Sequence, residues 1–172
     1  PELGIYLSMK LFLLMCLPSG LYGLDAQLIE EVVPCLEYTP LPNWSRPIAG
    51  MVECRSYRVP ILDLGWLLQQ APSPSVFGTR MVLLRKTPNQ RSAPLVALLA
   101  PNLIETVYTP SSLCLMPSLP GHYLHPVCQT EEGPIQVVDV PKLLKEQIDP
   151  VYDALQEAFL NVRGIDQSIV SH

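Results

Sequence analysis

Short apolar runs separated by proline, glycine and polar residues make up most of the chain. Runs of this length between turn-forming residues are typical of β-strands. One such run covers 11–17, and two more, at 51–54 and 59–64, flank a polar connection at 55–58. This pair predicts a β-hairpin. Because Pro60 has no N–H for a strand ladder, we expect its strand to lie at a sheet edge or a bulge.

The second part of the chain repeats the pattern of the first. Three segments recur in the same order and at nearly the same offset: 12–15 at 81–84, 28–32 at 103–107, and 62–64 at 138–140. The repeats predict two related subdomains, roughly 11–70 and 79–144, joined through a proline-rich linker at 71–75. Each subdomain has about five short strands, a number that closes into a small barrel, and strands can be exchanged between the two.

The end of the chain has a different period. Asp149-Pro150 is typical of a helix start, with an N-cap residue followed by proline at the first helical position. Apolar residues then recur at helical spacing as far as Val162, and Gly164 is placed to end the element. These signals predict a C-terminal helix over 149–164.

Composition limits the function more than it identifies it. The chain has 172 residues, of which 48% are hydrophobic and only 16% charged, and its net charge is −5. Without a Lys/Arg cluster it is unsuited to nucleic acid, and no apolar run approaches the ~20 residues of a membrane span, so we expect no membrane insertion. Five cysteines without a C-x-x-C pair predict reduced, mostly buried thiols in a cytoplasmic protein.

Two aspartates occupy equivalent places in the two halves, Asp63 and Asp139. A catalytic carboxylate pair is one interpretation. Each lies at the end of a strand run and just before leucine-containing segments, so helix or turn capping is the favoured interpretation.

A histidine-containing segment raises the question of a metal. His122 and His125 lie in a proline-rich stretch with Cys114 and Cys128 nearby. A zinc site would have closer ligand pairs, so no metal is predicted. With no catalytic triad and no glycine-rich phosphate loop, we also expect no cofactor and no enzyme activity.

Several segments together carry a family resemblance: Tyr22-Gly23-Leu24-Asp25, Glu31-Val32, Pro42, Ile48-x-Gly50-Met51-Val52-x-Cys54-Arg55, Val59-Pro60-Ile61-Leu62-Asp63-Leu64 and Val137-Val138-Asp139-Val140. With these motifs the chain resembles the CheW-like chemotaxis adaptor (coupling) proteins, as one domain over 9–144. The resemblance implies a mainly β fold of two SH3-like five-stranded barrels, here followed by the C-terminal helix. It also implies a non-catalytic cytoplasmic scaffold that binds the helical cytoplasmic tip of a chemoreceptor and the regulatory domain of a histidine kinase.

The resemblance also implies a receptor-binding groove, formed by Ile29, Val32, Gly50 and Arg55. An apolar groove beside a guanidinium suits an amphipathic helix that carries a carboxylate. The alternative for Arg55 is a structural ion pair with Glu31, and one residue can serve both roles. Ile29 and Val32 are three apart, so on a strand they face opposite sides and only one lines the groove.

The hairpin turn departs from the family pattern. The family has Arg-Gly where this chain has Arg55-Ser56. Without glycine a turn with positive φ is costlier, which favours another turn type.

Two hypotheses therefore stand beside each other. The first is an adaptor that couples chemoreceptor-like sensors to a histidine kinase and sits at membrane receptor clusters through its partners. The alternative is a regulatory module that binds a small ligand between its two barrels, which would require an enclosed apolar pocket there.

Overall fold

The computed structural model describes residues 9–41, 44, 46–74, 78–85, 96–110, 123–125 and 127–160. Its strands are β1 (Met9–Leu17), β2 (Gly20–Asp25), β3 (Ile29–Pro34), β4 (Thr39–Pro40), β5 (Ile48–Cys54), β6 (Tyr57–Asp63), β7 (Arg80–Leu84), β8 (Val96–Ala100), β9 (Leu103–Pro110), β10 (Cys128–Thr130) and β11 (Gly133–Val137). The helices are α2 (Leu64–Gln69), α3 (Val140–Gln147) and a C-terminal helix over 152–160, with 3-10 turns η1 (Ala26–Leu28) and η3 (Asp149–Val151). A mainly β protein is therefore confirmed.

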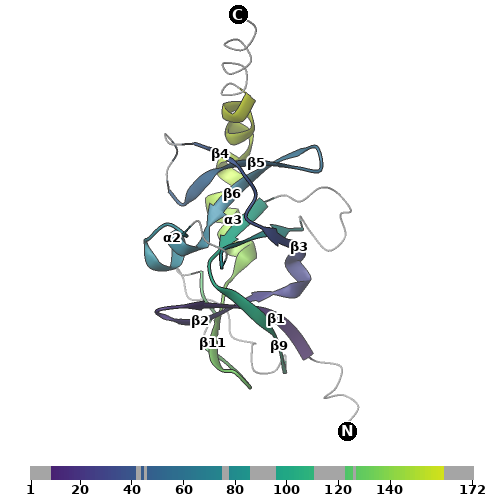
Figure 1. The fold of residues 1–172 in the computed structure, drawn as a ribbon, viewed down its shortest axis with the longest axis vertical. Coiled ribbons are helices and arrows are strands. Elements are labelled where there is room, and N and C mark those ends of the chain that lie inside the picture. The colour runs from purple at the N-terminus through teal and green to yellow at the C-terminus, as the bar shows by residue number, and fades with distance from the viewer. Residues whose placement is uncertain are drawn as a thin grey trace, which may run out of the picture.

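One sheet, called barrel 1 here, has the strand order β10-β11-β2-β1-β9. Its two outer strands approach each other, because the hydroxyl of Thr109 in β9 donates to the carbonyl of Gln129 in β10 at 2.9 Å. Six apolar residues fill its interior: Phe12, Leu14, Val107, Cys128, Ile135 and Val137. In Figure 1 the labelled strands β1, β2, β9 and β11 occupy the lower half of the molecule.

The other sheet, barrel 2, has the order β3-β7-β8-β6-β5-β4. Its labelled strands β4, β5 and β6 lie in the upper half of Figure 1. Pro60 pairs with Met51 of β5, and β6 has β8 as a second neighbour only from Ile61. The expectation that Pro60 would avoid a central strand is thus wrong for β6 as a whole, but Pro60 itself occupies an edge position, as expected. The proline is tolerated inside the sheet because it lies where β6 has a single paired neighbour.

Both sheets contain strands from both halves of the chain. Barrel 1 combines β1 and β2 with β9, β10 and β11, whereas barrel 2 combines β3 to β6 with β7 and β8. Each sheet therefore contains strands from both of the expected subdomains, 11–70 and 79–144. Exchange of strands between the subdomains would give this arrangement. The sequence repeat itself stays a prediction.

The largest core lies between the barrels rather than inside either. Along β7, Met81 and Leu83 face the interior of barrel 2, while Val82 and Leu84 belong to the shared core. Strand β8 divides in the same way and is buried over its whole length. Because these strands are covered on both faces, their sequences are unbroken apolar runs and do not alternate between apolar and polar residues.

Two helical elements complete the shared core. Helix α3 was not expected, and the domain boundary expected at 144 falls inside it. Leu155 and Phe159 of the C-terminal helix are buried in the same core as Leu143 of α3. Among the helices of the described residues, none has the length and apolar content needed to cross a membrane.

The start of the C-terminal helix differs from the expectation. Asp149 is not an N-cap, because it is the first residue of η3, and that turn has no side-chain cap hydrogen bond. The turn follows α3 almost directly, so the chain never leaves helical geometry long enough for a capping residue to act. Of the helix expected over 149–164, residues 161–164 lie outside the described part.

Candidate partner-binding site

The candidate site begins at the β5–β6 turn. Strand β6 starts at Tyr57, so the polar connection expected over 55–58 is a two-residue turn. Arg55 has φ 49° and Ser56 has φ 69°. Positive φ at both central residues is typical of the type I′ turn, whose twist matches that of a β-hairpin. The expectation of another turn type is wrong, and the chain accepts the steric cost of two side chains in the left-handed region.

This cost gives a stability prediction. Replacing Ser56 with glycine should raise the free energy of unfolding by about 1 kcal/mol, because glycine adopts positive φ without strain. The measurement is chemical denaturation. Ser56→Ala is the control, since it removes the hydroxyl but keeps Cβ; an equal gain from alanine would show that backbone conformation is not the cause.

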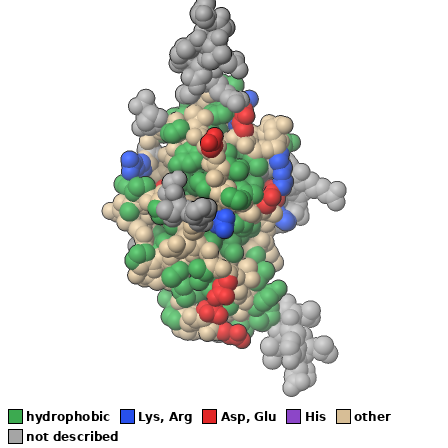
Figure 2. Space-filling model, viewed as in Figure 1, with side chains coloured by type: hydrophobic (Ala, Val, Ile, Leu, Met, Phe, Trp, Pro, Cys, Tyr) green, Lys and Arg blue, Asp and Glu red, His purple; other side chains and the backbone are tan. Residues whose placement is uncertain are grey.

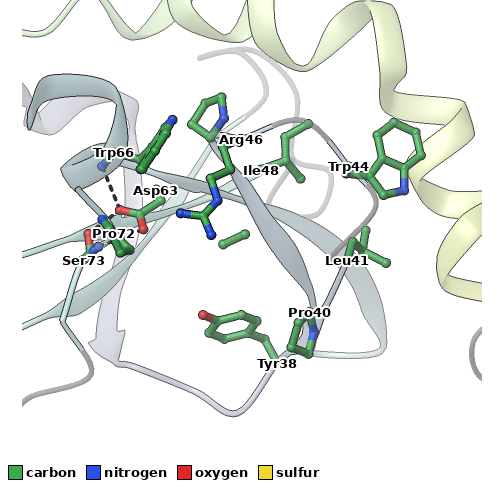
Figure 3. Close-up of a pocket in the computed structure, with 12 residues that line it drawn as sticks. Tyr38, Pro40, Leu41, Trp44, Arg46, Ile48, Asp63, Trp66, Pro72 and Ser73 are labelled. Carbon is green, nitrogen blue, oxygen red and sulfur yellow. Dashed lines mark hydrogen bonds between the residues drawn. The ribbon is translucent and has the colours of Figure 1, made fainter. Parts of the chain in front are cut away.

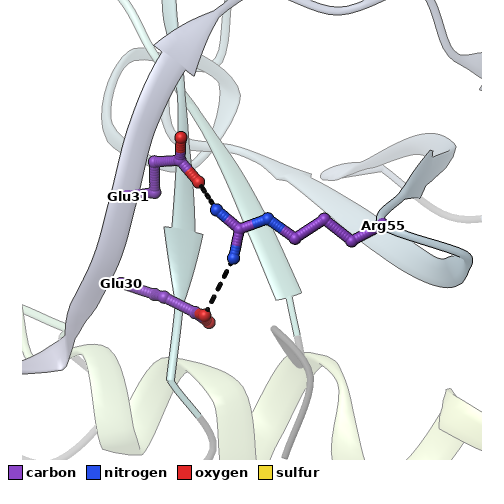
Figure 4. A network of polar contacts seen from close by, with 3 residues as sticks. All are labelled: Glu30, Glu31 and Arg55. Atoms are coloured by element: carbon purple, nitrogen blue, oxygen red, sulfur yellow. Dashed lines mark hydrogen bonds and ion pairs between the residues drawn. The ribbon is translucent and has the colours of Figure 1, made fainter.

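Arg55 bridges to two consecutive glutamates on β3. Its Nη1 lies 3.2 Å from Oε1 of Glu30, and its Nη2 donates to Oε2 of Glu31 (Figure 4). The sequence analysis predicted Glu31 as the partner of Arg55, and the structure adds Glu30 as a second partner. The pairing register shifts between Ile29 and Glu31, and such a bulge breaks the strict alternation that would point consecutive side chains to opposite faces.

The ion pairs also join the two ends of a sheet. Strand β3 lies at one edge of barrel 2, whereas β5 lies beside the opposite edge strand β4. The contact of Arg55 with β3 therefore closes the curled sheet at the hairpin end. All three side chains are partly exposed, with 55% for Arg55, so the pairs contribute at most about 1 kcal/mol.

The two strands that this cation joins also carry exposed apolar side chains. Val32, one residue beyond Glu31, is 41% exposed, and Tyr57, directly after the turn, is 51% exposed. Ile29 is partly buried against the shared core. Val32 is thus available to a partner and Ile29 has mainly a packing role. The sequence analysis did not identify Tyr57 as a candidate contact residue. It placed Tyr57 inside the polar connection at 55–58 and not at the start of an exposed strand end.

Gly50 lies away from this group. Four residues separate it from Arg55 along β5, about 16 Å in an extended strand. It is buried, and a Cβ at this position would lie 2.2 Å from the carbonyl oxygen of Thr39 in β4. Packing against β4 therefore explains glycine here, and a partner contact at Gly50 stays a prediction.

The paired aspartates both cap helices. The side chain of Asp63 accepts from the N–H of Trp66 at 3.3 Å, and that of Asp139 accepts from the N–H of Lys142 at 3.2 Å. These bonds lie at the starts of α2 and α3. The capping interpretation is confirmed, and the two carboxylates belong to different helix ends.

A pocket of about 340 Å³ lies beside β4, β5 and α2 (Figure 3). All of its lining residues fall within 38–73. It is therefore confined to the edge of barrel 2 and does not lie between the barrels, where the small-ligand alternative required one.

The segment with histidine and cysteine forms other contacts. Nε2 of His125 lies 3.6 Å from Oδ2 of Asp139, and Cys128 is buried and disulfide-bonded. The expectation of reduced thiols is wrong for Cys128, while Cys16, Cys35 and Cys54 are free. The expectation of mostly buried thiols is also wrong for these three, because Cys16 and Cys35 are exposed and Cys54 is partly exposed. His122 and Cys114 lie outside the described residues. Among the residues that are described, no three potential ligands gather as a metal site would require.

Comparisons with known proteins agree with this architecture. A family model described as CheW-like domain matches residues 11–148. The crystal structure of the scaffolding protein TtCheW from Thermoanaerobacter tengcongensis is similar, with a TM-score of 0.60 and 19% sequence identity, covering 75% of this chain and 83% of that chain. Comparison with curated protein sequences gave no significant match. The family resemblance and the fold class of two SH3-like barrels with a C-terminal helix are confirmed.

Proposed function

Because the chain belongs to the CheW-like domain family, we propose that it is a non-catalytic adaptor that couples chemoreceptor-like sensors to a histidine kinase in chemotaxis-type signalling. The observation that carries this proposal is the exposed guanidinium of Arg55, together with exposed apolar side chains on the strands that it joins, Val32 on β3 and Tyr57 on β6. A cation fixed beside exposed apolar side chains suits an amphipathic helix that presents a carboxylate. The protein acts in the cytoplasm and reaches membrane receptor clusters through its partners.

In this proposal the receptor tip occupies the Arg55 end of barrel 2. Its apolar face covers Val32 and Tyr57, and one of its carboxylates approaches the guanidinium of Arg55. Arg55 keeps Glu30 and Glu31 as neighbours, which orient the side chain but lower its net positive charge. Recognition therefore depends on apolar contact at least as much as on charge.

The kinase regulatory domain takes a separate surface. Strand β9 of barrel 1 presents Ile104 and Tyr108, which are 55% and 62% exposed, and Met9 at the start of β1 is 44% exposed. In the face shown in Figure 2, hydrophobic side chains gather in patches over much of the surface, while acidic side chains cluster near the lower end. Such exposed apolar area is typical of a protein-binding surface. Bivalent binding would set the geometry of receptor and kinase without any bond chemistry.

The two surfaces predict separable losses of binding. Val32→Ser should weaken capture of a receptor-tip fragment by about tenfold and leave kinase-domain capture unchanged, and Tyr108→Ser should do the reverse. Both side chains are exposed, so folding should be preserved. The measurement is pull-down of each purified partner separately, with dissociation constants from titration.

Arg55→Ala supplies the charge test in the same assay. It should weaken receptor capture while changing stability by less than about 1 kcal/mol. Arg80→Ala is the matched change of charge elsewhere, at the exposed first residue of the otherwise buried strand β7. If Arg55→Ala binds both partners as the native chain does, Arg55 is not a contact residue. If the native chain binds neither partner, the coupling function is wrong.

A further inference from the structure

The pocket at the edge of barrel 2 includes the cation of Arg46, an exposed residue. The guanidinium carbon of Arg46 lies 4.8 Å from the centroid of the Trp66 ring. Within the described residues Arg46 makes no ion pair. Figure 3 shows the guanidinium directed into the pocket, on the same side as Trp66 and Asp63. A guanidinium placed against an indole is held in position while its N–H donors stay available.

The acidic residue in the pocket wall already has its own donors. Asp63 is only 7% exposed. Its carboxylate accepts from the backbone N–H of Trp66, from the N–H of Ser73 at 2.9 Å and from the hydroxyl of Ser73. Its hydrogen-bonding capacity is therefore directed to the local chain rather than to a ligand. Of the two charged side chains that line the pocket, Arg46 is the one for which the described residues supply no ion-pair or hydrogen-bond partner.

The remaining wall is mostly apolar and aromatic. It includes the side chains of Tyr38, Pro40, Leu41, Trp44, Ile48 and Trp66. A volume of about 340 Å³ lies at the lower end of the range of about 300–1,000 Å³ for small-molecule sites. The phenol of Tyr38 is neutral at pH 7, as an ordinary tyrosine is, and can donate a hydrogen bond; burial, with smaller effects from Cys35 and Asp63, raises its pKa further.

We propose that this pocket binds a small aromatic monocarboxylate. The carboxylate accepts hydrogen bonds from Arg46, and the ring lies against the aromatic and aliphatic wall. Charge and volume together select this class. An uncharged ring gains no charge-assisted hydrogen bond from Arg46, and a short aliphatic acid does not cover the apolar wall of the pocket. The site is separate from the Arg55 surface and from β9, so the proposal does not rest on the adaptor function.

The chain is suited to a direct test, because it contains only two tryptophans and both line the pocket. Their two indole N–H signals can be followed by NMR in the full chain during titration with phenylacetate. We expect saturable shifts with a Kd on the order of 1 mM. The matched probes are 2-phenylethanol, which has the ring without the charge, and acetate, which has the charge without the ring. Each should bind about tenfold more weakly or worse.

Two variants with the same change of charge complete the test. Arg46→Gln should weaken phenylacetate about tenfold and leave 2-phenylethanol unchanged, whereas Arg80→Gln should change neither. If Arg46→Gln does not fold, Arg46→Lys is the substitute variant, because it keeps the positive charge. The comparison of phenylacetate, 2-phenylethanol and acetate on the native chain then still tests whether the site requires both a ring and a carboxylate. Equal affinity for phenylacetate and 2-phenylethanol, or no saturable shift, would overturn the proposal. The peptide Gly-Gly-Phe presents the same ring and carboxylate at a peptide C-terminus. If it binds more tightly than phenylacetate, the ligand is a peptide C-terminus, and the proposal of a small free acid is overturned.

Discussion

Phe159→Ala is expected to lower the free energy of unfolding by about 3–5 kcal/mol, the range for removing a fully buried phenylalanine. Phe159 is 2% exposed and packs in the core shared by the two barrels. It lies beyond residue 148, where the match to the family model ends. The C-terminal helix should therefore behave as a structural part of the domain, which urea denaturation would measure.

The next residue provides the matched control. Leu160 belongs to the same helix but is 52% exposed, so Leu160→Ala should change stability by less than about 1 kcal/mol. A similar small effect at Phe159 would mean that the helix detaches from the core without cost. A large effect at both positions would mean that Leu160 also packs against the core, contrary to its exposure, because alanine has the higher helix propensity and cannot itself cause a loss.

Gly50→Ala is expected to destabilise the protein by about 3 kcal/mol, because the new methyl group has no room. The obstacle is backbone: Cβ would lie 2.2 Å from the carbonyl oxygen of Thr39 and 3.0 Å from Cα of Pro40. Either β4 must leave β5 or β5 must bend. Since Pro40 also lines the pocket beside Trp66, the substitution should shift the indole N–H signals as well.

Gly78→Ala is the matched control: it adds the same methyl group at a position where the nearest atom belongs to a movable side chain and not to the backbone. There the nearest atom to an added Cβ is Oδ1 of Asn102, at 2.8 Å, which belongs to a side chain that can move. We expect a loss of less than about 1 kcal/mol from this variant. If Gly50→Ala costs no more than Gly78→Ala, close approach of β4 does not explain the glycine.

The strands and the family could be predicted from the sequence because their signals are local. Apolar runs between prolines and glycines gave the β fold, and the segment from Ile48 to Leu64 carried the resemblance. The capping role of Asp63 could also be predicted, since it depends only on the residues that follow. Helix α3 was missed because Pro141 and the preceding strand signal masked a short apolar pattern.

The site was less predictable because it depends on contacts between distant segments. Glu30 joins Arg55 only because a bulge interrupts β3, and no local pattern marks that bulge. The pocket requires Arg46 and Trp66 to meet across a turn, a helix and two strands. The cost of Cβ at Gly50 comes from the backbone of β4, eleven residues earlier, and cannot be read from the glycine itself.

The exchange of strands has a consequence for synthesis on the ribosome. The first hairpin, β1–β2, needs β9 beside β1 and β11 beside β2, and Ile135 is the residue that pairs with Leu21. Barrel 2 likewise cannot form without β7 and β8, which lie between β3 and β6 in its sheet. Neither barrel can be completed while the second half of the chain is still being made. The apolar strands of the first half must therefore stay unpaired and protected from aggregation until late in translation.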